Sequence, residues 1–100
     1  MNRQTDPAVL AGLWQVICDR AEHPSESSYT SRLLTDPKGI DKVLEKVGEE
    51  STEFILAAKN GISARTTEEA SDLIFHLLVA LRAADVELAD VLEVLERRRR

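Results

Sequence analysis

Two acidic segments carry the residues of this sequence that are best suited to chemistry. Glu50 and Glu53 lie three residues apart in the first segment, and Glu69 and Asp72 lie three apart in the second. Residues at this spacing point to the same side of an α-helix, so each segment offers a pair of carboxylates. If the two helices pack against each other, the four carboxylates meet in one small volume. Such a group repels itself unless protons or cations lie between its members, and the spacing therefore predicts a metal site.

The chemistry of these ligands indicates which ion the site binds. Carboxylates supply only oxygen atoms, which favour a hard cation such as Mg²⁺, with Mn²⁺ as an alternative. In proteins these ions commonly accompany phosphate groups, whose negative charge they neutralise. We therefore expect a divalent metal site that serves a small phosphate-bearing substrate.

A solvated helix face is the simpler explanation of the same carboxylates. Lys46 supplies a cation one turn before Glu49 and Glu50, as surface helices often do. Glu53 and Asp72, in contrast, have no Lys or Arg three or four residues away. Spacing alone therefore leaves both explanations open.

Glu69 also has a purely local explanation. Thr66 and Glu69 match a capping box, in which the glutamate reaches back to the first residue of the helix. In that case the helix begins at Thr66, and Arg65 precedes it. His76 lies one turn after Asp72 and is placed to orient it by a hydrogen bond. A buried histidine whose hydrogen bonds are satisfied is the simpler alternative for His76.

The periodicity of apolar residues predicts the helices that carry these groups. We expect helices at 6–21, 36–60, 66–84 and from about 87 onward, with a short structured piece at 32–34 inside a loop at 23–36. Asp-Pro pairs indicate the starts at 6 and 36, and Asn60-Gly61 indicates a helix stop. Positions 84–85 contain neither glycine nor proline, so we expect only a kink there. The pattern predicts an all-α bundle of four to five helices.

The composition limits the class of protein. One hundred residues suit a single domain, which we assign to 1–100. A net charge of −5 argues against general binding to nucleic acids or membrane surfaces. Cys18 is the only cysteine, which excludes an internal disulfide and a cysteine-based zinc site. No apolar run is long enough for a membrane span and no signal-peptide pattern opens the chain, so we expect a cytoplasmic protein.

The apolar stretch at 73–81 predicts self-association. Only His76 interrupts it, and a helix that is apolar on all sides must be covered on all sides. Phe75 and Val79 project opposite to Leu77, and a small helical monomer has little left to cover them. We therefore expect a homodimer, or a higher homo-oligomer, with this helix at its centre.

The loop at 23–36 is the part of the chain best suited to contact a substrate. It combines serines and threonines with Arg32 in a region without helical periodicity. Hydroxyls and a guanidinium in an ordered loop bind phosphates or a ribose. A solvated connector is the simpler alternative.

Taken together, these residues resemble the MazG-like superfamily of all-α nucleoside triphosphate pyrophosphatases. The resemblance rests on Glu-Glu-x-x-Glu at 49–53 followed by Glu-x-x-Asp at 69–72. The chain also resembles one family of that superfamily, the phosphoribosyl-ATP pyrophosphatases, in the segments 28–30, 46–50 and 69–78. The likeness runs from about Leu10 to Arg97.

The resemblance implies a MazG-like all-α fold completed by dimerisation, a Mg²⁺-dependent activity and a nucleotide substrate. It implies metal ligands at Glu50, Glu53, Glu69 and Asp72. It adds Glu49 as an acid that holds a further ion or polarises the attacking water, so that the catalytic residues are Glu49, Glu50 and Glu53. It implies substrate contacts at Ser28, Tyr29, Thr30, Lys42 and Lys46.

The implied reaction is the hydrolysis of phosphoribosyl-ATP to phosphoribosyl-AMP and pyrophosphate, the second step of histidine biosynthesis. Water attacks in line and the bond between the α- and β-phosphorus atoms breaks, without a covalent enzyme intermediate. Two other functions stay open. One is a house-cleaning pyrophosphatase for ordinary or damaged nucleotides, and the other is a non-catalytic helical interaction module.

Two segments depart from the family's pattern. The turn before the last helix is commonly glycine followed by a small hydroxyl residue, but here it reads Asp85-Val86-Glu87. The sequence at 35–38 also differs from the family's pattern. Some relatives are fused to a cyclohydrolase domain. With one cysteine and no spare length, this chain is not expected to carry that domain.

Overall fold

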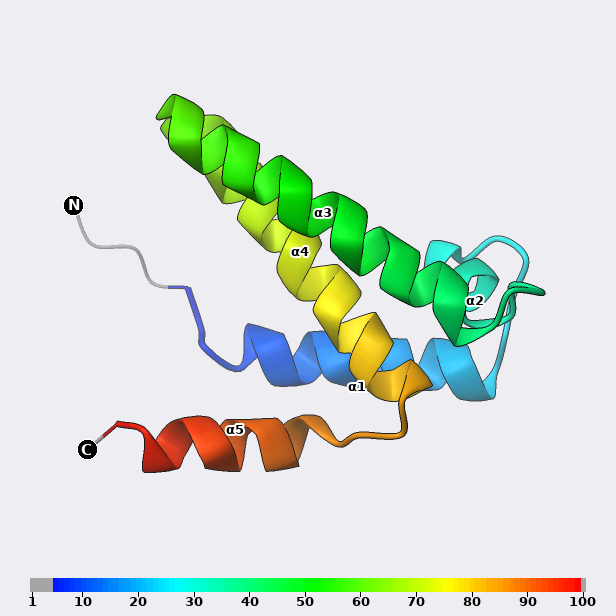
Figure 1. Cartoon of the computed structure of the whole chain (residues 1–100). Helices are drawn as coiled ribbons and strands as arrows, with labels where there is room; N and C mark the ends of the chain where they lie inside the picture. Colours follow the sequence, from blue (N-terminus) through cyan, green and yellow to red (C-terminus); the bar gives the residue numbers. More distant parts are fainter. Residues whose placement is uncertain (1–4, 100) are drawn as a thin grey trace.

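A computed structural model describes residues 5–99 and shows them as an all-helical chain, with no strand among these residues (Figure 1). The five helices are α1 (Val9–Glu22), α2 (Tyr29–Leu34), α3 (Ile40–Asn60), α4 (Ser63–Ala83) and α5 (Leu88–Arg97). The predicted all-α class with four to five helices is confirmed. None of the described helices has the length and apolar character needed to span a membrane.

A long antiparallel hairpin of α3 and α4 is the main feature of the fold (Figure 1). It turns at Gly61, which ends α3 as predicted and whose φ of +73° lies in the left-handed region that favours glycine. α1 and α2 pack against the end of the hairpin where α3 begins and α4 ends, whereas the Gly61 tip projects away from them (Figure 1). The hairpin therefore has a covered half and a projecting half.

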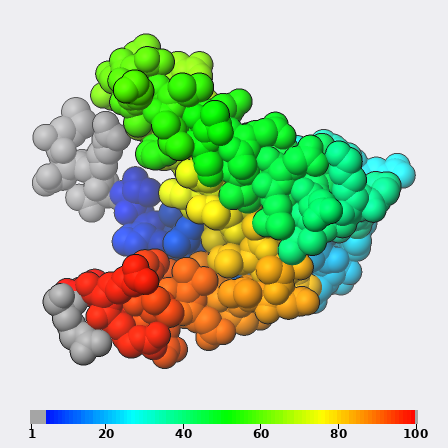
Figure 2. All heavy atoms as spheres, in the orientation of Figure 1, coloured from blue at the N-terminus to red at the C-terminus, as the bar shows by residue number. Residues whose placement is uncertain are grey.

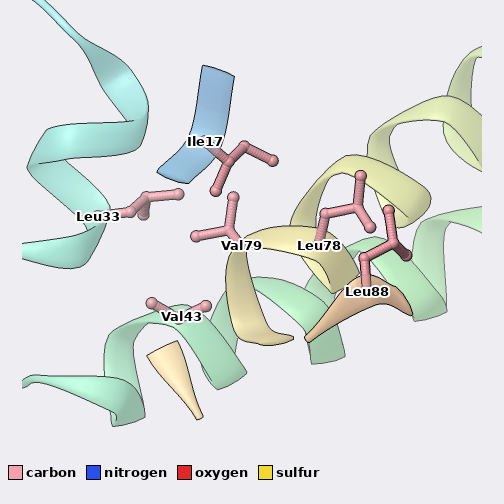
Figure 3. Packing of buried hydrophobic residues seen from close by; sticks show 6 residues of the cluster. All are labelled: Ile17, Leu33, Val43, Leu78, Val79 and Leu88. Atoms are coloured by element: carbon pink, nitrogen blue, oxygen red, sulfur yellow. The ribbon is translucent and has the colours of Figure 1, made fainter. Parts of the chain in front are cut away.

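The hydrophobic core lies where all five helices meet. Figure 3 shows its six buried side chains: Ile17, Leu33, Val43, Leu78, Val79 and Leu88. Each helix contributes at least one of them, and burying a side chain of this size stabilises the fold by about 1.5–3 kcal/mol. This core fixes the position of α3 relative to α4, which the acidic residues further along the hairpin require.

The two Asp-Pro pairs form turns before the helices rather than their first residues. The Asp6 carboxylate accepts a hydrogen bond from the Ala8 N–H, and the Asp36 carboxylate accepts one from the Lys38 N–H, both at 2.9 Å. These side-chain bonds to the backbone two residues on favour a turn over a helix. The predicted starts at 6 and 36 are therefore too early, since the helices begin at Val9 and Ile40.

The capping box that offered a local explanation of Glu69 does not fit the start of α4. α4 begins at Ser63, so Thr66 already lies inside the helix, where its hydroxyl donates to the Ile62 carbonyl oxygen at 3.1 Å. A threonine inside a helix commonly bonds back to the carbonyl one turn earlier. Glu69 is therefore not needed as a cap.

The segment at 23–36 is more ordered than predicted, because α2 spans six residues instead of the expected three at 32–34. Ser28 caps this helix, with its Oγ accepting a hydrogen bond from the Ser31 N–H at 3.1 Å. Ser31 is buried, and its hydroxyl donates to the Arg20 carbonyl oxygen at 2.9 Å. Two serines of the predicted loop thus have structural roles, since Ser28 caps α2 and Ser31 bonds α2 to α1.

The chain reverses sharply between α4 and α5, and the expected kink is wrong. Asp85 has a φ of +58°, and the Val86 N–H bonds to the Leu81 carbonyl oxygen at 2.9 Å. Aspartate tolerates the left-handed region better than most residues, which explains how the turn forms without glycine. α5 then begins at Leu88, close to the predicted position.

The apolar run on α4 is covered differently from the prediction. Val79 is fully buried and Phe75 is half-buried within the same chain, so the expectation that both lack cover is wrong. The exposed residues of this apolar run are instead Leu77, which is 44% exposed, and Ile74, which is 47% exposed. α1 and α2 pack on the Val79 side and leave the opposite side open.

Candidate active site

Three carboxylates from α3 and α4 converge between the two helices. One oxygen atom from each of Glu50, Glu69 and Asp72 lies within 4.8 Å of the other two. Glu50 comes from α3, and the other two come from α4. The antiparallel pairing of the helices brings the middle of one against the middle of the other. The structure therefore brings together three of the four carboxylates that spacing predicts to share a site.

The fourth carboxylate, Glu53, lies at the edge of this group. It follows Glu50 by one turn and is exposed, yet its carboxylate interacts with both Glu50 and Glu69 and raises the pKa of each. Glu53 also lines a hollow of about 310 Å³ at the hairpin tip, together with Asn60, Arg65 and Glu69. Glu53 and Asp72 are thus the exposed members of the group, whereas Glu50 and Glu69 are shielded from solvent.

Glu50 is the most buried of these acids. It is 7% exposed, and its Oε2 atom has no hydrogen-bond partner among the described residues. Burial raises the pKa of Glu50, Glu53 raises it further, and His76 and Lys46 only partly oppose this. A buried carboxylate oxygen without a partner is costly, and a bound cation removes that cost.

Glu69 mirrors Glu50 from the facing helix. Its side chain is 13% exposed, and its Oε2 atom likewise has no partner within the described part of the chain. Burial raises the pKa of Glu69, as do Glu53 and Asp72, while Arg65 lowers it. Two unpartnered oxygens on facing helices, in a set of donors that contains only oxygen, fit a hard divalent cation such as Mg²⁺.

Two cations flank the acidic group. The Lys46 ammonium lies 3.6 Å from the Glu49 carboxylate and 3.7 Å from that of Glu50. On α4, the Arg65 guanidinium lies 3.5 Å from the Glu69 carboxylate. Arg65 was missed as a site residue because the helix was expected to begin after it. With the start at Ser63, its spacing of four from Glu69 would have indicated the pair.

Glu49 lies apart from the three converging carboxylates. Its side chain is 55% exposed, and it contacts Lys46. Lys42 lies one turn before Lys46 on α3 and is half-buried. The structure thus places Lys46 directly at the acidic group and Lys42 one turn further from it along the helix.

The three adjoining residues 28–30 have different environments. Ser28 uses its hydroxyl oxygen as the cap of α2, and Thr30 is only 8% exposed. Tyr29 is 42% exposed, and its hydroxyl lies 2.9 Å from Nε2 of His76. Of these three side chains, that of Tyr29 is the most exposed.

His76 is a buried histidine with both ring nitrogens engaged. Its Nδ1 atom lies 2.7 Å from the backbone carbonyl oxygen of Asp72, and its Nε2 atom meets Tyr29. The bond to Asp72 therefore involves the backbone and not the carboxylate that His76 was expected to orient. The simpler alternative, a satisfied core histidine, describes these contacts.

Comparison with known proteins decides the family. The family described as phosphoribosyl-ATP pyrophosphohydrolase matches residues 10–99. The chain belongs to this family. It is 72% identical over 95 residues to a phosphoribosyl-ATP pyrophosphatase of Methanoregula boonei, covering 95% of this chain and 91% of the relative. It is 65% identical over 96 residues to one of Methanosphaerula palustris, covering 96% and 97%.

A longer relative shows the same unit joined to another. The chain is 49% identical over 87 residues to the histidine biosynthesis bifunctional protein HisIE of Prochlorococcus marinus, which covers 87% of this chain and 38% of the relative. Membership of the phosphoribosyl-ATP pyrophosphohydrolase family confirms the resemblance found in the sequence. The acidic group between α3 and α4 is thus the candidate active site of a member of this family.

Proposed function

We propose that this protein hydrolyses phosphoribosyl-ATP to phosphoribosyl-AMP and pyrophosphate, the second step of histidine biosynthesis. The observation that carries the proposal is the convergence of Glu50, Glu69 and Asp72 in a chain of the phosphoribosyl-ATP pyrophosphohydrolase family. Relatives that match almost the whole chain bear the name of this activity. The chain acts as one domain in this proposal.

The acidic group holds a divalent cation. Glu50, Glu69 and Asp72 bind Mg²⁺, or Mn²⁺ in its place, with Glu53 as the fourth ligand. When bound, such a cation would neutralise phosphate charge and make the departing pyrophosphate a better leaving group. The unpartnered oxygens of Glu50 and Glu69 support this assignment.

The protein's own side chains bind the substrate and manage the proton. Lys46 donates hydrogen bonds to a phosphate, because its ammonium stands at the border of the acidic group. A carboxylate accepts the proton of the water that attacks in line. Glu53, which faces the hollow at the hairpin tip, and the exposed Glu49 are the two candidates for this role. Bond breakage between the α- and β-phosphorus atoms releases pyrophosphate.

Pyrophosphate release from phosphoribosyl-ATP, measured with and without Mg²⁺, tests the proposal. The expected result is release that depends on the ion and exceeds release from each member of a deoxynucleoside triphosphate panel. Preference for a deoxynucleoside triphosphate would assign a house-cleaning pyrophosphatase instead. No hydrolysis of any nucleotide, and no effect of Mg²⁺ on stability, would indicate a non-catalytic helical module.

Self-association is a second part of the proposal. Exposed apolar side chains on α3, α4 and α5 support a homodimer or a higher homo-oligomer; they include Ile55, Leu56, Leu77, Leu92 and Leu95. Sedimentation of the wild type and of Leu77→Glu tests this, with a smaller particle expected for the variant. Monomeric wild type at micromolar concentration would contradict it. A cytoplasmic location stays a prediction that cell fractionation checks.

A further inference from the structure

Two cations lie at opposite ends of the acidic group, and the proposed reaction uses only Lys46. Lys46 precedes Glu50 by one turn of α3, and Arg65 precedes Glu69 by one turn of α4. Because the two helices are antiparallel, a step back along α3 leads toward the covered half of the hairpin, whereas a step back along α4 leads toward its tip (Figure 1). Arg65 therefore lies where a second anionic group of a substrate can bind.

The guanidinium of Arg65 has N–H donors available for a ligand. It forms an ion pair with Oε1 of Glu69 at 3.5 Å, whereas the Arg20 guanidinium donates a hydrogen bond to Asp19 at 2.7 Å. The Arg65 side chain is 63% exposed, so a ligand can reach it from solvent. A guanidinium carries its donors in a planar fork that matches the oxygens of a phosphate. One long ion pair leaves most of this fork unused.

Glu69 connects Arg65 to the proposed cation site. Its Oε1 atom faces Arg65, whereas its shielded Oε2 atom is the one without a hydrogen-bond partner among residues 5–99. Both oxygens belong to one carboxylate, so the side of Glu69 that is open to a cation adjoins the side that Arg65 occupies. Arg65 thus borders the cation site.

The hollow of about 310 Å³ at the hairpin tip gives an anion room beside Arg65. Its volume lies at the lower end of the range of about 300–1,000 Å³ that is usual for small-molecule sites. Two acids, two side chains with N–H donors and two large apolar side chains line it: Glu53, Glu69, Asn60, Arg65, Leu56 and Ile62. Because the two acids also belong to the acidic group, the hollow is continuous with the cation site.

A second hollow, of about 460 Å³, borders the acidic group at Asp72 and differs in chemistry. Its lining includes Leu10 and Leu13 of α1 and Phe75 of α4, and no cation lines it within the described part of the chain. Pyrophosphate carries several negative charges, which a guanidinium stabilises and an apolar wall does not. The contrast between the two hollows therefore indicates that the charged end of a nucleotide lies at the hairpin tip.

We propose that the hollow at the hairpin tip is the subsite for the β- and γ-phosphates, in which Arg65 binds the pyrophosphate that the reaction releases. The inference rests on the proposed function and deepens it, because it gives the substrate a direction along the hairpin. The α-phosphate and the nucleoside lie toward the covered half, where Lys46 is placed. Arg65 offsets the negative charge that the leaving group gains as the bond breaks.

Calorimetric binding of the two products at saturating Mg²⁺ tests the proposal. Arg65→Gln should weaken the binding of pyrophosphate about tenfold, the loss expected for one hydrogen bond to a charged group, and should leave that of phosphoribosyl-AMP unchanged. Arg65→Lys, which keeps the charge, should recover part of the affinity. Lys59→Gln is the matched control, since it removes an exposed cation from the last turn of α3, and it should leave both affinities unchanged.

The two products separate the proposed contact from other effects of Arg65. A guanidinium repels a cation, so its removal does not weaken the binding of Mg²⁺, which a titration with the ion alone checks. An unchanged affinity for pyrophosphate in Arg65→Gln would overturn the proposal, because Arg65 would then form only a surface ion pair. A loss for phosphoribosyl-AMP as large as that for pyrophosphate would also overturn it. Circular dichroism should show unchanged helical content, since the side chain is exposed.

These outcomes are distinguishable from failure of the proposed function, because the binding of pyrophosphate does not depend on which nucleotide is hydrolysed. If Arg65→Gln weakens pyrophosphate binding but the wild type prefers a deoxynucleoside triphosphate, the proposed substrate is wrong and the subsite is supported. If the wild type hydrolyses phosphoribosyl-ATP and both proteins bind pyrophosphate equally, the proposed function is supported and the subsite is refuted.

Discussion

The two halves of the α3/α4 hairpin use the same pair of helices for opposite chemistry. In the half covered by α1 and α2, the facing side chains are apolar and include Val43, Leu78 and Val79. Nearer the projecting tip, the facing side chains include Glu50 and Glu69, which are shielded from solvent. Each has an oxygen atom without a hydrogen-bond partner among residues 5–99. The apolar half therefore stabilises the packing of α3 on α4. The acidic half instead holds carboxylates in a buried environment that disfavours their ionised form.

This contrast shows how a small helical protein keeps a strained site. Burial and mutual repulsion raise the pKa of Glu50 and Glu69, so their ionised forms cost stability in the absence of a cation. The apolar half offsets that cost, because it holds α3 and α4 together independently of the acids. Figure 2 shows the projecting half as the green arm that stands clear of α5, with a hollow between the two.

The largest expected effect comes from removing one buried charge at the acidic half. Glu50→Gln keeps the shape of the side chain and should reduce turnover by at least about a thousandfold, since a lost ion ligand removes several kcal/mol of transition-state stabilisation. Circular dichroism should show unchanged helical content. The matched control is Glu45→Gln at an exposed acid on the same helix, which should keep its activity. Full activity in Glu50→Gln would refute the site assignment.

A substitution in the core that packs against the apolar half should lower the stability of the fold without removing a residue of the candidate active site. Ile17 is fully buried, and Ile17→Ala should lower the free energy of unfolding by about 2–5 kcal/mol, the usual cost of such a cavity. Its neighbour Val16 is 45% exposed, and Val16→Ala should change the same quantity by less than about 0.5 kcal/mol. Urea unfolding measures both. Equal losses in the two variants would contradict the division between the halves.

Divalent ions should restore the stability that the ionised carboxylates of the acidic half remove. Mg²⁺ at one hundred times its Kd should stabilise the wild type by about 2.7 kcal/mol, because it binds the native state. Thermal unfolding with and without the ion measures this. Ile17→Ala should keep the gain and Glu50→Gln should lose it. A gain that survives in Glu50→Gln would place the ion elsewhere.

The smallest expected effect is the response to pH without divalent ions. A carboxyl group whose pKa is raised in the folded state binds its proton more tightly there, so its contribution to stability falls as pH rises. The penalty is absent below the usual pKa of about 4.3 and complete above the raised value. Between pH 5 and 7.5, wild type should therefore lose more stability than Glu50→Gln. Urea midpoints of the two proteins, with Glu68→Gln as a control at an exposed acid, measure the difference. Parallel curves would contradict the assigned pKa direction.

Much of the fold followed from local patterns. Apolar periodicity predicted the three long helices and the last one. Asn60-Gly61 predicted the end of α3, since a glycine with positive φ commonly ends a helix. The helix starts were less predictable. The carboxylates of Asp6 and Asp36 accept hydrogen bonds from the backbone of a turn instead of a helix. An Asp-Pro sequence is compatible with either structure, so the sequence did not distinguish them.

The candidate site likewise has a part that the sequence predicted and a part that it did not. Spacing placed Glu50 with Glu53 and Glu69 with Asp72, because each pair belongs to one helix. The distance between the pairs depended on how α3 packs on α4, which no local pattern contains. Arg65 was excluded by a misplaced helix start, and the contact between Tyr29 and His76 joins residues 47 positions apart.

The sequence by itself determined the helices, the pairing of carboxylates within each of them and the family to which the chain belongs, because these depend on residues close together or on the pattern as a whole. Only the tertiary structure decided which acids are buried, which oxygens lack a partner, and which side of α4 stays open. The reason is physical. Burial and the electrostatics that follow from it depend on packing between helices, and packing is a property of the whole chain.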